Sequence, residues 1–243
     1  MHPKILVEDA KQSPKPKIHD LAILNARVLD VFTGALDTKT VLVEDGLIHG
    51  FGSEPAKETF EAKGAVLLPS LIDSNVHIES PMLSPANFAS LVLPFGTTTV
   101  TADPHEMTND AMHGLVEACR DLPLVVKLMV PSCVPALPFE DEGAFIDAGQ
   151  TQALLEHPEF FGLGEMMNVP GILNGNPEAC SKVAVALNLD KPVDGHAPLC
   201  TGADLEAYAR AGIRTDHECT TSSKLRKLFK STLNNRLCSN LAV

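Results

Sequence analysis

The chain has 243 residues, 44% of them hydrophobic, which is enough for one sizeable core and a small appendage. Its formal net charge is −12, from 19 basic and 31 acidic residues, and this balance argues against a surface that binds nucleic acid or an anionic membrane. No apolar run approaches the length of a membrane span, and the N-terminus lacks a signal-peptide pattern.

Residues 1–19 are polar and include Pro14 and Pro16, so we expect a loose leader there. Short β-type runs separated by turn signals then occupy residues 20–69. Glu44-Asp45-Gly46 is a strong hairpin signal between two of these runs. The pattern predicts a small antiparallel β unit. The β-type runs are residues 21–24, 27–32, 40–43 and 47–51.

From residue 70 to residue 221 the pattern changes to alternating strands and helices. Successive strand starts are about 20 to 36 residues apart, close to the repeat unit of an eightfold barrel. This predicts an α/β fold, an incomplete (β/α) barrel of about six units that follows the small antiparallel β unit. The strand candidates are residues 67–72, 97–102, 124–130, 160–165, 193–196 and 213–217, and the helix candidates are residues 110–119, 147–156 and 179–187.

Four residues of metal-ligand type stand at the ends of four strand candidates: His77, Glu165, His196 and His217. The C-terminal ends of parallel barrel strands converge on one site, and His with carboxylate suits zinc, iron or manganese. A single His at a strand end is more often a hydrogen-bonded structural residue. Four such positions together favour a metal site, and Glu165 would be costly to bury without a partner.

Several longer motifs in the chain are specific when taken together. They are Asp30-Val31-Phe32-Thr33-Gly34, His77-Ile78-Glu79-Ser80-Pro81-Met82-Leu83, Gly96-Thr97-Thr98-Thr99-Val100, Asp103-Pro104-His105-Glu106, Pro131-Ser132-Cys133-Val134-Pro135-Ala136, Gly162-Leu163-Gly164-Glu165-Met166-Met167, Asp194-Gly195-His196-Ala197-Pro198 and Asp216-His217-Glu218. With these motifs, residues 20–221 resemble the adenine deaminases of the amidohydrolase superfamily.

The resemblance implies a metal-dependent hydrolase that converts adenine to hypoxanthine and ammonia by means of a metal-activated hydroxide. The expected cofactor is a divalent metal, manganese or iron, and the expected setting is purine salvage or adenine catabolism. Residues 20–69 would form part of a β-sandwich, and residues 70–221 a partial amidohydrolase barrel. Adenine is the expected binding partner, and we expect the protein to bind neither nucleic acid nor a membrane. Formation of a homo-oligomer stays an open possibility.

The resemblance also assigns roles to single residues. His77 corresponds to the second His of the family's His-x-His, and Asn75 stands where the family has the first; a neutral amide is a poorer ligand than imidazole. Glu165 corresponds to the carboxylate that bridges two metals, and His196 and His217 to the ligands of the second metal. The motif around His105 and Glu106 either contributes to proton transfer or is only a turn and helix start, with Asp103 as the cap.

Zinc nucleobase deaminases are a different class, because they pair His-x-Glu with Pro-Cys-x-x-Cys. The six cysteines, at positions 119, 133, 180, 200, 219 and 238, form no Cys-x-x-Cys motif. Scattered cysteines are typical of a reduced intracellular protein, so we expect a cytoplasmic location.

The resemblance stops after Thr221, and residues 222–243 hold five Lys or Arg and no acidic residue. We expect this basic tail to be solvated or disordered. The family's strand-eight Asp has no counterpart, which predicts a C-terminally truncated protein. Two interpretations stay open: an adenine deaminase, or a truncated, non-catalytic remnant that at most binds metal or a partner.

Overall fold

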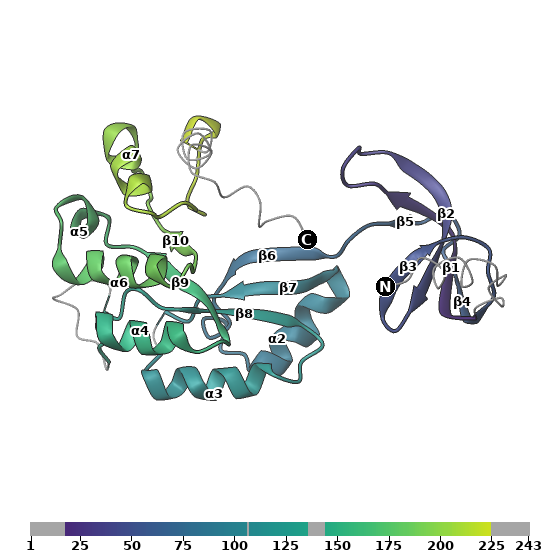
Figure 1. Cartoon of the computed structure of the whole chain (residues 1–243), viewed down its shortest axis with the longest axis horizontal. Helices are drawn as coiled ribbons and strands as arrows, with labels where there is room; N and C mark the ends of the chain where they lie inside the picture. The colour runs from purple at the N-terminus through teal and green to yellow at the C-terminus, as the bar shows by residue number, and fades with distance from the viewer. Residues whose placement is uncertain (1–17, 106, 136–143, 225–243) are drawn as a thin grey trace, which may run out of the picture. The chain divides into compact units, whose positions relative to one another are not determined.

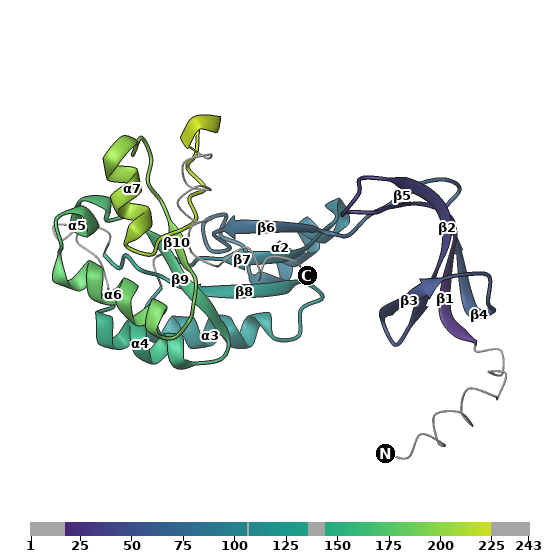
Figure 2. The ribbon, with the colours of Figure 1, turned by 45° about the horizontal axis from the view of Figure 1, so that its top comes forward.

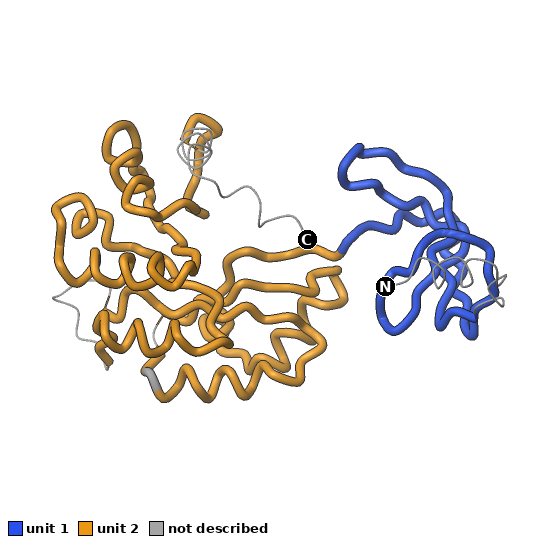
Figure 3. Tube along the Cα trace, viewed as in Figure 1, with its two compact units in different colours: residues 1–69 blue, residues 70–243 orange. Residues whose placement is uncertain are grey.

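The computed structural model describes residues 18–105, 107–135 and 144–224 (Figure 1). The chain divides after Pro69 into two compact units (Figure 3). Glu106, the basic tail beyond Lys224 and the leader up to residue 17 lie outside the described residues.

The N-terminal unit is one mixed sheet. Strands β1, β2 and β3 form an antiparallel meander as predicted, but β4 and β5 both pair parallel with β1. The purely antiparallel prediction was wrong there because burial periodicity reports the face of a strand and not the direction of its neighbour. The strands are β1 (His19–Leu29), β2 (Leu36–Glu44), β3 (Leu47–Phe51), β4 (Ala56–Glu61) and β5 (Val66–Leu67).

The predicted hairpin joins β2 to β3. Asp45 and Gly46 have φ values of 51° and 74°, the left-handed conformations that a tight two-residue hairpin turn needs. Asp20 of β1 accepts a hydrogen bond from the backbone N of Asp45 at 2.8 Å and one from Lys57 Nζ at 2.7 Å. The first contact holds the tip of the hairpin next to the start of β1, and the second joins β4 to the same residue of β1.

The C-terminal unit is built on five parallel strands in the order β10-β9-β8-β7-β6, which curl into part of a barrel (Figures 1 and 2). This confirms the incomplete barrel. The first strand candidate is split, because residues 66–67 pair with β1 and the barrel strand starts at Leu71. The strands are β6 (Leu71–Val76), β7 (Thr97–Ala102), β8 (Val125–Val130), β9 (Phe160–Met166) and β10 (Val193–Gly195).

The sixth strand candidate, residues 213–217, is not a strand. It nevertheless lies beside β10, where the Thr215 hydroxyl donates to the backbone O of Val193 at 3.5 Å. This segment therefore continues the barrel wall next to β10 through side-chain contacts, without the backbone hydrogen bonds that join paired strands.

The predicted helices correspond to α3, α4 and α6, and sequence periodicity missed α2, α5 and α7. Helices α4 and α6 pack against the strands of the sheet around a core that includes Val100, Leu155 and Leu163. None of the helices in the described ranges is long and apolar enough to span a membrane. The helices are α2 (Pro85–Val92), α3 (Asn109–Cys119), α4 (Ala148–Glu156), α5 (Val169–Leu173), α6 (Pro177–Asn188) and α7 (Gly202–Arg210), with a 3₁₀ turn at Leu93–Phe95.

Lys224, the last described residue, is not solvated as we expected of the tail. It is 4% exposed, and its Nζ lies 2.6 Å from Asp216 Oδ2. The start of the tail is therefore packed against the segment that carries His217.

Candidate metal centre

The centre is organised around Glu165 in β9, whose side chain is only 2% exposed. Its Oε1 lies 3.2 Å from His77 Nε2 and 3.2 Å from His217 Nε2. Its Oε2 lies 3.0 Å from His196 Nδ1 and 3.4 Å from His105 Nε2. Each imidazole comes from a different part of the barrel wall. Three of the rings follow β6, β7 and β10, and the fourth lies in segment 213–217. Strand order thus gathers one carboxylate and four rings at one end of the sheet.

The ligand atoms form two groups that share Glu165. One group contains His77 and His105, the other contains His196 and His217, and within each group the atoms lie within 4.8 Å of one another. The sequence placed His77, Glu165, His196 and His217 together, and the structure brings all four into contact. It also brings in His105, for which the sequence left open a role in proton transfer or in a turn and helix start, at a position where a ligand would stand.

Asn75, near the end of β6, contacts Glu165 and the group that contains His217. Its Nδ2 donates to Glu165 Oε1 at 2.8 Å and lies 2.8 Å from His217 Nδ1. A weaker contact of 3.4 Å joins Nδ2 to Asp194 Oδ2. The Asn75 amide is therefore a hydrogen-bond donor to the carboxylates of Glu165 and Asp194.

Asp103 is 2% exposed and contacts both His77 and Glu165. Its backbone O lies 2.7 Å from His77 Nδ1, which directs the Nε2 of His77 towards Glu165. Its Oδ2 accepts from the backbone N of Glu165 at 2.6 Å. The alternative of Asp103 as a helix cap is wrong, because α3 starts later and Thr108 caps it.

A glycine permits this close approach. A Cβ at Gly164 would stand 2.3 Å from Asp103 Oδ1, so any larger residue would displace the carboxylate. This gives a physical reason for glycine immediately before Glu165.

Two further carboxylates contact the histidines of the centre, one at a ring and one at the backbone, and the sequence did not assign them a role. Asp194 Oδ2 lies 3.5 Å from His217 Nδ1, and its other oxygen accepts from the Thr215 hydroxyl. Glu79 Oε1 accepts from the backbone N of His105 at 3.0 Å. Both residues stood inside recognised motifs, beside or near the histidines, which was the signal that could have identified them.

The charge of Glu165 depends on these contacts. Burial by itself raises the pKa of the Glu165 carboxyl, but side-chain hydrogen bonds from His105, His217, His77 and Asn75 outweigh it and hold the pKa well below its usual range. The carboxylate therefore stays ionised and available as a ligand.

The same kind of contact raises the pKa values of two of the imidazoles. The hydrogen bond to Glu165 raises the pKa of His77 to about 9, and hydrogen bonds to Asp194 and then Glu165 raise the pKa of His217 to about 10. Burial raises the pKa of Asp103 to about 6. In the metal-free protein the rings of His77 and His217 thus hold protons that a metal ion would displace.

The donor set fits a divalent metal. Each group supplies two ring nitrogens and a share of one buried, ionised carboxylate, a combination that suits zinc, iron or manganese. A buried carboxylate also requires nearby positive charge, which either protonated rings or a metal ion provides.

An open cavity of about 520 Å³ lies beside His196, between α5, α7 and the loop that follows β10. Its wall is mainly apolar and includes one carboxylate, that of Asp204. The lining residues are Met167, Val169, Pro170, Leu173, His196, Pro198, Leu199, Cys200 and Asp204.

Comparison with protein families matches residues 66–233 of this chain to the amidohydrolase family. The matched range contains all five residues of the centre and runs past Thr221, where we expected the resemblance to end.

Among curated proteins, the chain is similar to adenine deaminases. It is 48% identical over 212 residues to the adenine deaminase of Nitratidesulfovibrio vulgaris (strain DP4), covering 86% of this chain and 37% of that protein. It is 44% identical over 214 residues to the adenine deaminase of Desulfatibacillum aliphaticivorans, covering 86% of this chain and 38% of that protein. The chain therefore spans well under half the length of the relatives that it matches.

Among solved structures, the fold is similar to that of N-acyl-D-glutamate deacylase from Bordetella bronchiseptica, with a TM-score of 0.67 and 17% identity over 90% of this chain and 57% of that one. An adenine deaminase crystal structure gives a TM-score of 0.51 with 18% identity, covering 79% of this chain and 54% of that one. At these identities the likeness concerns the fold alone.

Proposed function

The chain belongs to the amidohydrolase family, and we propose that its metal centre hydrolyses adenine to hypoxanthine and ammonia. The observation that carries the proposal is the buried Glu165 carboxylate with four imidazole nitrogens 3.0–3.4 Å from its oxygens. The similarity to adenine deaminases supports adenine as the substrate. In the reaction, water adds an oxygen at the purine carbon that bears the amine, and that carbon–nitrogen bond breaks.

We propose that His77 and Glu165 hold one divalent ion and that Glu165, His196 and His217 hold another. When bound at these residues, such an ion would make a water available that is deprotonated near neutral pH. Manganese is the ion that we propose, with iron as the alternative, because the site combines imidazole with a hard carboxylate oxygen. Asp103 and Asp194 keep the rings of His77 and His217 oriented through the contacts described above.

For proton transfer we propose His105, together with Glu106. His105 Nε2 lies 3.4 Å from Glu165 Oε2, and its Nδ1 lies 3.8 Å from Asp103 Oδ1. Because burial raises the pKa of Asp103 to about 6, this carboxyl can exchange a proton near neutral pH. Glu106 itself lies outside the described residues.

The cavity beside His196 is the proposed place for the purine. Its volume of about 520 Å³ is within the range of roughly 300–1,000 Å³ that is common for ligand pockets. Apolar side chains can contact the faces of the ring, and Asp204 can accept a hydrogen bond from a purine N–H. Such a reaction would belong to purine salvage or adenine catabolism, and the scattered cysteines support a cytoplasmic setting.

A second candidate function rests on Asn75. Its amide donates a hydrogen bond to Glu165 and lies beside His217, at the position where an imidazole would offer a metal another nitrogen. A chain that lacks this ligand could bind metal at one group and turn over no substrate. The alternative is therefore a non-catalytic metal-binding protein.

The decisive experiment follows the absorbance change from adenine to hypoxanthine with added manganese, in the natural chain and in the Asn75→His and Glu165→Gln variants. Turnover by the natural chain that Glu165→Gln abolishes supports the proposed hydrolase. Metal retention without turnover supports the second function. Turnover that appears only in Asn75→His would identify Asn75 as the cause of the lost activity.

A further inference from the structure

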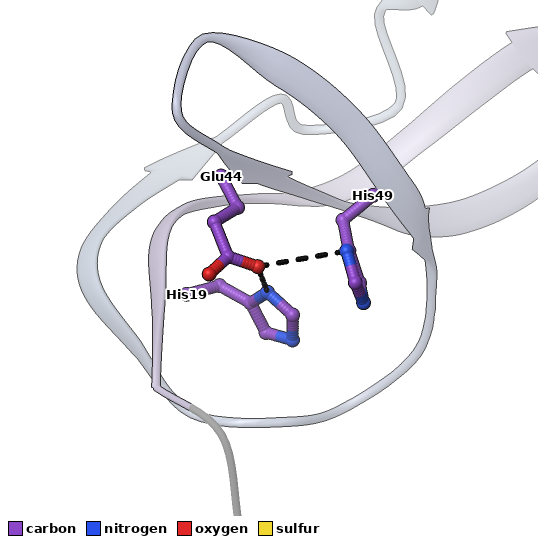
Figure 4. Close-up of side chains that lie close together, drawn as sticks. All are labelled: His19, Glu44 and His49. Atoms are coloured by element: carbon purple, nitrogen blue, oxygen red, sulfur yellow. Dashed lines mark ion pairs between the residues drawn. The ribbon is translucent and has the colours of Figure 1, made fainter.

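A second cluster of metal-ligand type lies in the N-terminal unit and shares no residue with the barrel centre. His19, Glu44 and His49 place three ligand atoms within 4.8 Å of one another. The Nδ1 atoms of His19 and His49 lie 3.7 Å and 3.5 Å from the same oxygen, Glu44 Oε2, and both rings face it (Figure 4). Neither histidine received a functional interpretation from the sequence.

The sheet builds this cluster from three strands. Glu44 ends β2 and His49 lies in β3, on the two arms of the hairpin, while His19 starts β1. The pairing of β2 with β3 passes from Val43↔Ile48 to Leu42↔Gly50, so His49 falls between two paired positions. A bulge of this kind redirects a side chain. It turns His49 towards Glu44.

The hairpin is also held in place beside His19. Asp20, the next residue in the chain, binds the turn at Asp45 and is itself bound by Lys57, at 2.8 Å and 2.7 Å. The spacing between the three ligand side chains is therefore supported by contacts of Asp20 that do not involve those side chains. The site is preorganised.

His19 supplies an independent observation. The residue is 2% exposed, and its Nδ1 is buried without a hydrogen-bond partner among the residues that the structure describes. A buried nitrogen without a partner costs free energy, because it gives up its hydrogen bonds to water. This nitrogen faces the Glu44 carboxylate at a distance too long for a hydrogen bond but suited to an ion held between them.

We propose that His19 Nδ1, Glu44 Oε2 and His49 Nδ1 bind one divalent zinc-type metal ion. Zinc bonds of about 2.0–2.1 Å in tetrahedral geometry place neighbouring ligand atoms about 3.3–3.4 Å apart. The observed separations of 3.7 Å and 3.5 Å need only a small contraction to match. Two imidazole nitrogens and one carboxylate oxygen are a donor set that zinc accepts.

The ion would act on the N-terminal unit as a clamp. It joins the start of β1 to both arms of the β2–β3 hairpin, so opening the sheet at this point would require its release. The His49 side chain is 49% exposed, which leaves room for a water molecule at the remaining coordination position. The site is separate from the proposed function, since no residue of the barrel centre takes part in it.

The competing explanation is an ordinary ion pair, in which protonated His19 and His49 flank Glu44. Their rings also contact each other, with centroids 4.7 Å apart. An ion pair would hold the same residues together without any response to zinc. The two explanations therefore differ in what zinc does to this sheet.

The test is hydrogen–deuterium exchange of the full chain with and without zinc, followed by mass spectrometry of peptides that cover residues 19–51. At free zinc about 100 times its dissociation constant, exchange through opening of this sheet should slow about 100-fold. Peptides from the barrel centre are read separately, so zinc bound there does not confuse the result.

The variants His49→Ala and Glu44→Gln should abolish the zinc-dependent protection of residues 19–51. His49 is exposed and Gln has nearly the shape of Glu, so both proteins should fold, as their zinc-free exchange will show. The matched control is His113→Ala, which removes an exposed imidazole from α3 and should leave the protection intact. Absence of zinc protection in the natural chain, or its persistence in both variants, would overturn the proposal.

Discussion

At the scale of residues, the barrel centre depends on the negative charge of Glu165. Its two oxygens contact the rings of His77, His105, His196 and His217, so this carboxylate is the one group common to both sets of ligands. A change that keeps its shape but removes its charge should therefore affect both sets at once.

We predict that Glu165→Gln reduces metal affinity by more than the roughly 10–100-fold loss that is typical when a supporting residue is removed. The reason is that both ligand groups lose the negative charge of the carboxylate that they share, and one of its two oxygens becomes an amide nitrogen, which cannot bind a metal. Metal analysis after manganese loading and gel filtration measures the effect. The matched control is Glu117→Gln, which neutralises a side chain that is 66% exposed on α3 and should change nothing. Equal metal content in the two variants would contradict the assignment of Glu165.

A second prediction at this scale concerns pH. In the folded protein, hydrogen bonds to Glu165 and Asp194 raise the pKa of His77 to about 9 and that of His217 to about 10. A raised histidine pKa stabilises the fold fully below the unfolded value of about 6.5, and this stabilisation is lost as pH rises through the folded value. The metal-free protein should therefore lose stability between about pH 7 and pH 10.

Urea denaturation in the presence of a chelator measures this loss. Asp103 does not contribute to it, because its pKa of about 6 lies below the window. Added manganese should give the reverse trend, with stabilisation that grows as pH rises, because the metal competes with fewer protons. The variant His113→Ala is the control and should keep the pH dependence, whereas a flat profile in the natural chain would rule out these raised values.

At the scale of elements, the position of His217 depends on contact between segment 213–217 and β10. A Cβ on Gly195 would stand 2.3 Å from the backbone O of Thr215 and 2.8 Å from Ile213 Cγ2. Glycine at position 195 thus lets the segment approach close enough for His217 to reach Glu165, although the segment has no strand ladder to hold it.

We predict that Gly195→Ala pushes the segment away, destabilises the protein by about 1–3 kcal/mol and weakens the metal group of His196 and His217. Thermal unfolding and metal analysis measure the two effects. Gly114→Ala is the matched control: it is the same substitution in α3, with no atom within 4 Å of the new Cβ. It should stabilise the protein by roughly 0.5–1 kcal/mol through helix propensity. Similar effects of the two substitutions would refute the close-approach argument.

At the scale of the whole molecule, the described barrel sheet has β6 and β10 at its two edges. Apolar side chains on β6 are exposed, with Leu71 at 54% and Ile72 at 65%. An exposed apolar edge strand presents unpaired backbone N–H and C=O groups and apolar side chains that can pair with another chain. We therefore expect this protein to self-associate through β6.

The substitution Ile72→Lys should lower this association, because a charged side chain on an edge strand opposes pairing with a second chain. Sedimentation velocity across a range of concentrations measures the effect. Leu91→Lys is the matched control, since Leu91 is 56% exposed but lies in α2, where the helix pairs its own backbone groups. If the natural chain stays monomeric, or if both variants associate equally, β6 is not the contact.

The sequence by itself determined five of the barrel strands, three of the helices and four of the residues that meet at the centre. Alternation and helical spacing report which face of an element is buried, and strand order then brings the ends of parallel strands together. For that reason His77, Glu165, His196 and His217 could be identified as one group although 140 positions separate the first from the last.

Only the tertiary structure decided the parts that depend on contacts between distant elements. The parallel pairing of β4 and β5 with β1 leaves no trace in the periodicity of those strands. His105 lies against Glu165, and His19 lies close to Glu44 and His49, because loops and a bulge place their rings. Such placement follows from backbone geometry that no local pattern encodes. Local sequence patterns indicate where many of the strands and helices form. Packing in three dimensions decides which side chains come into contact.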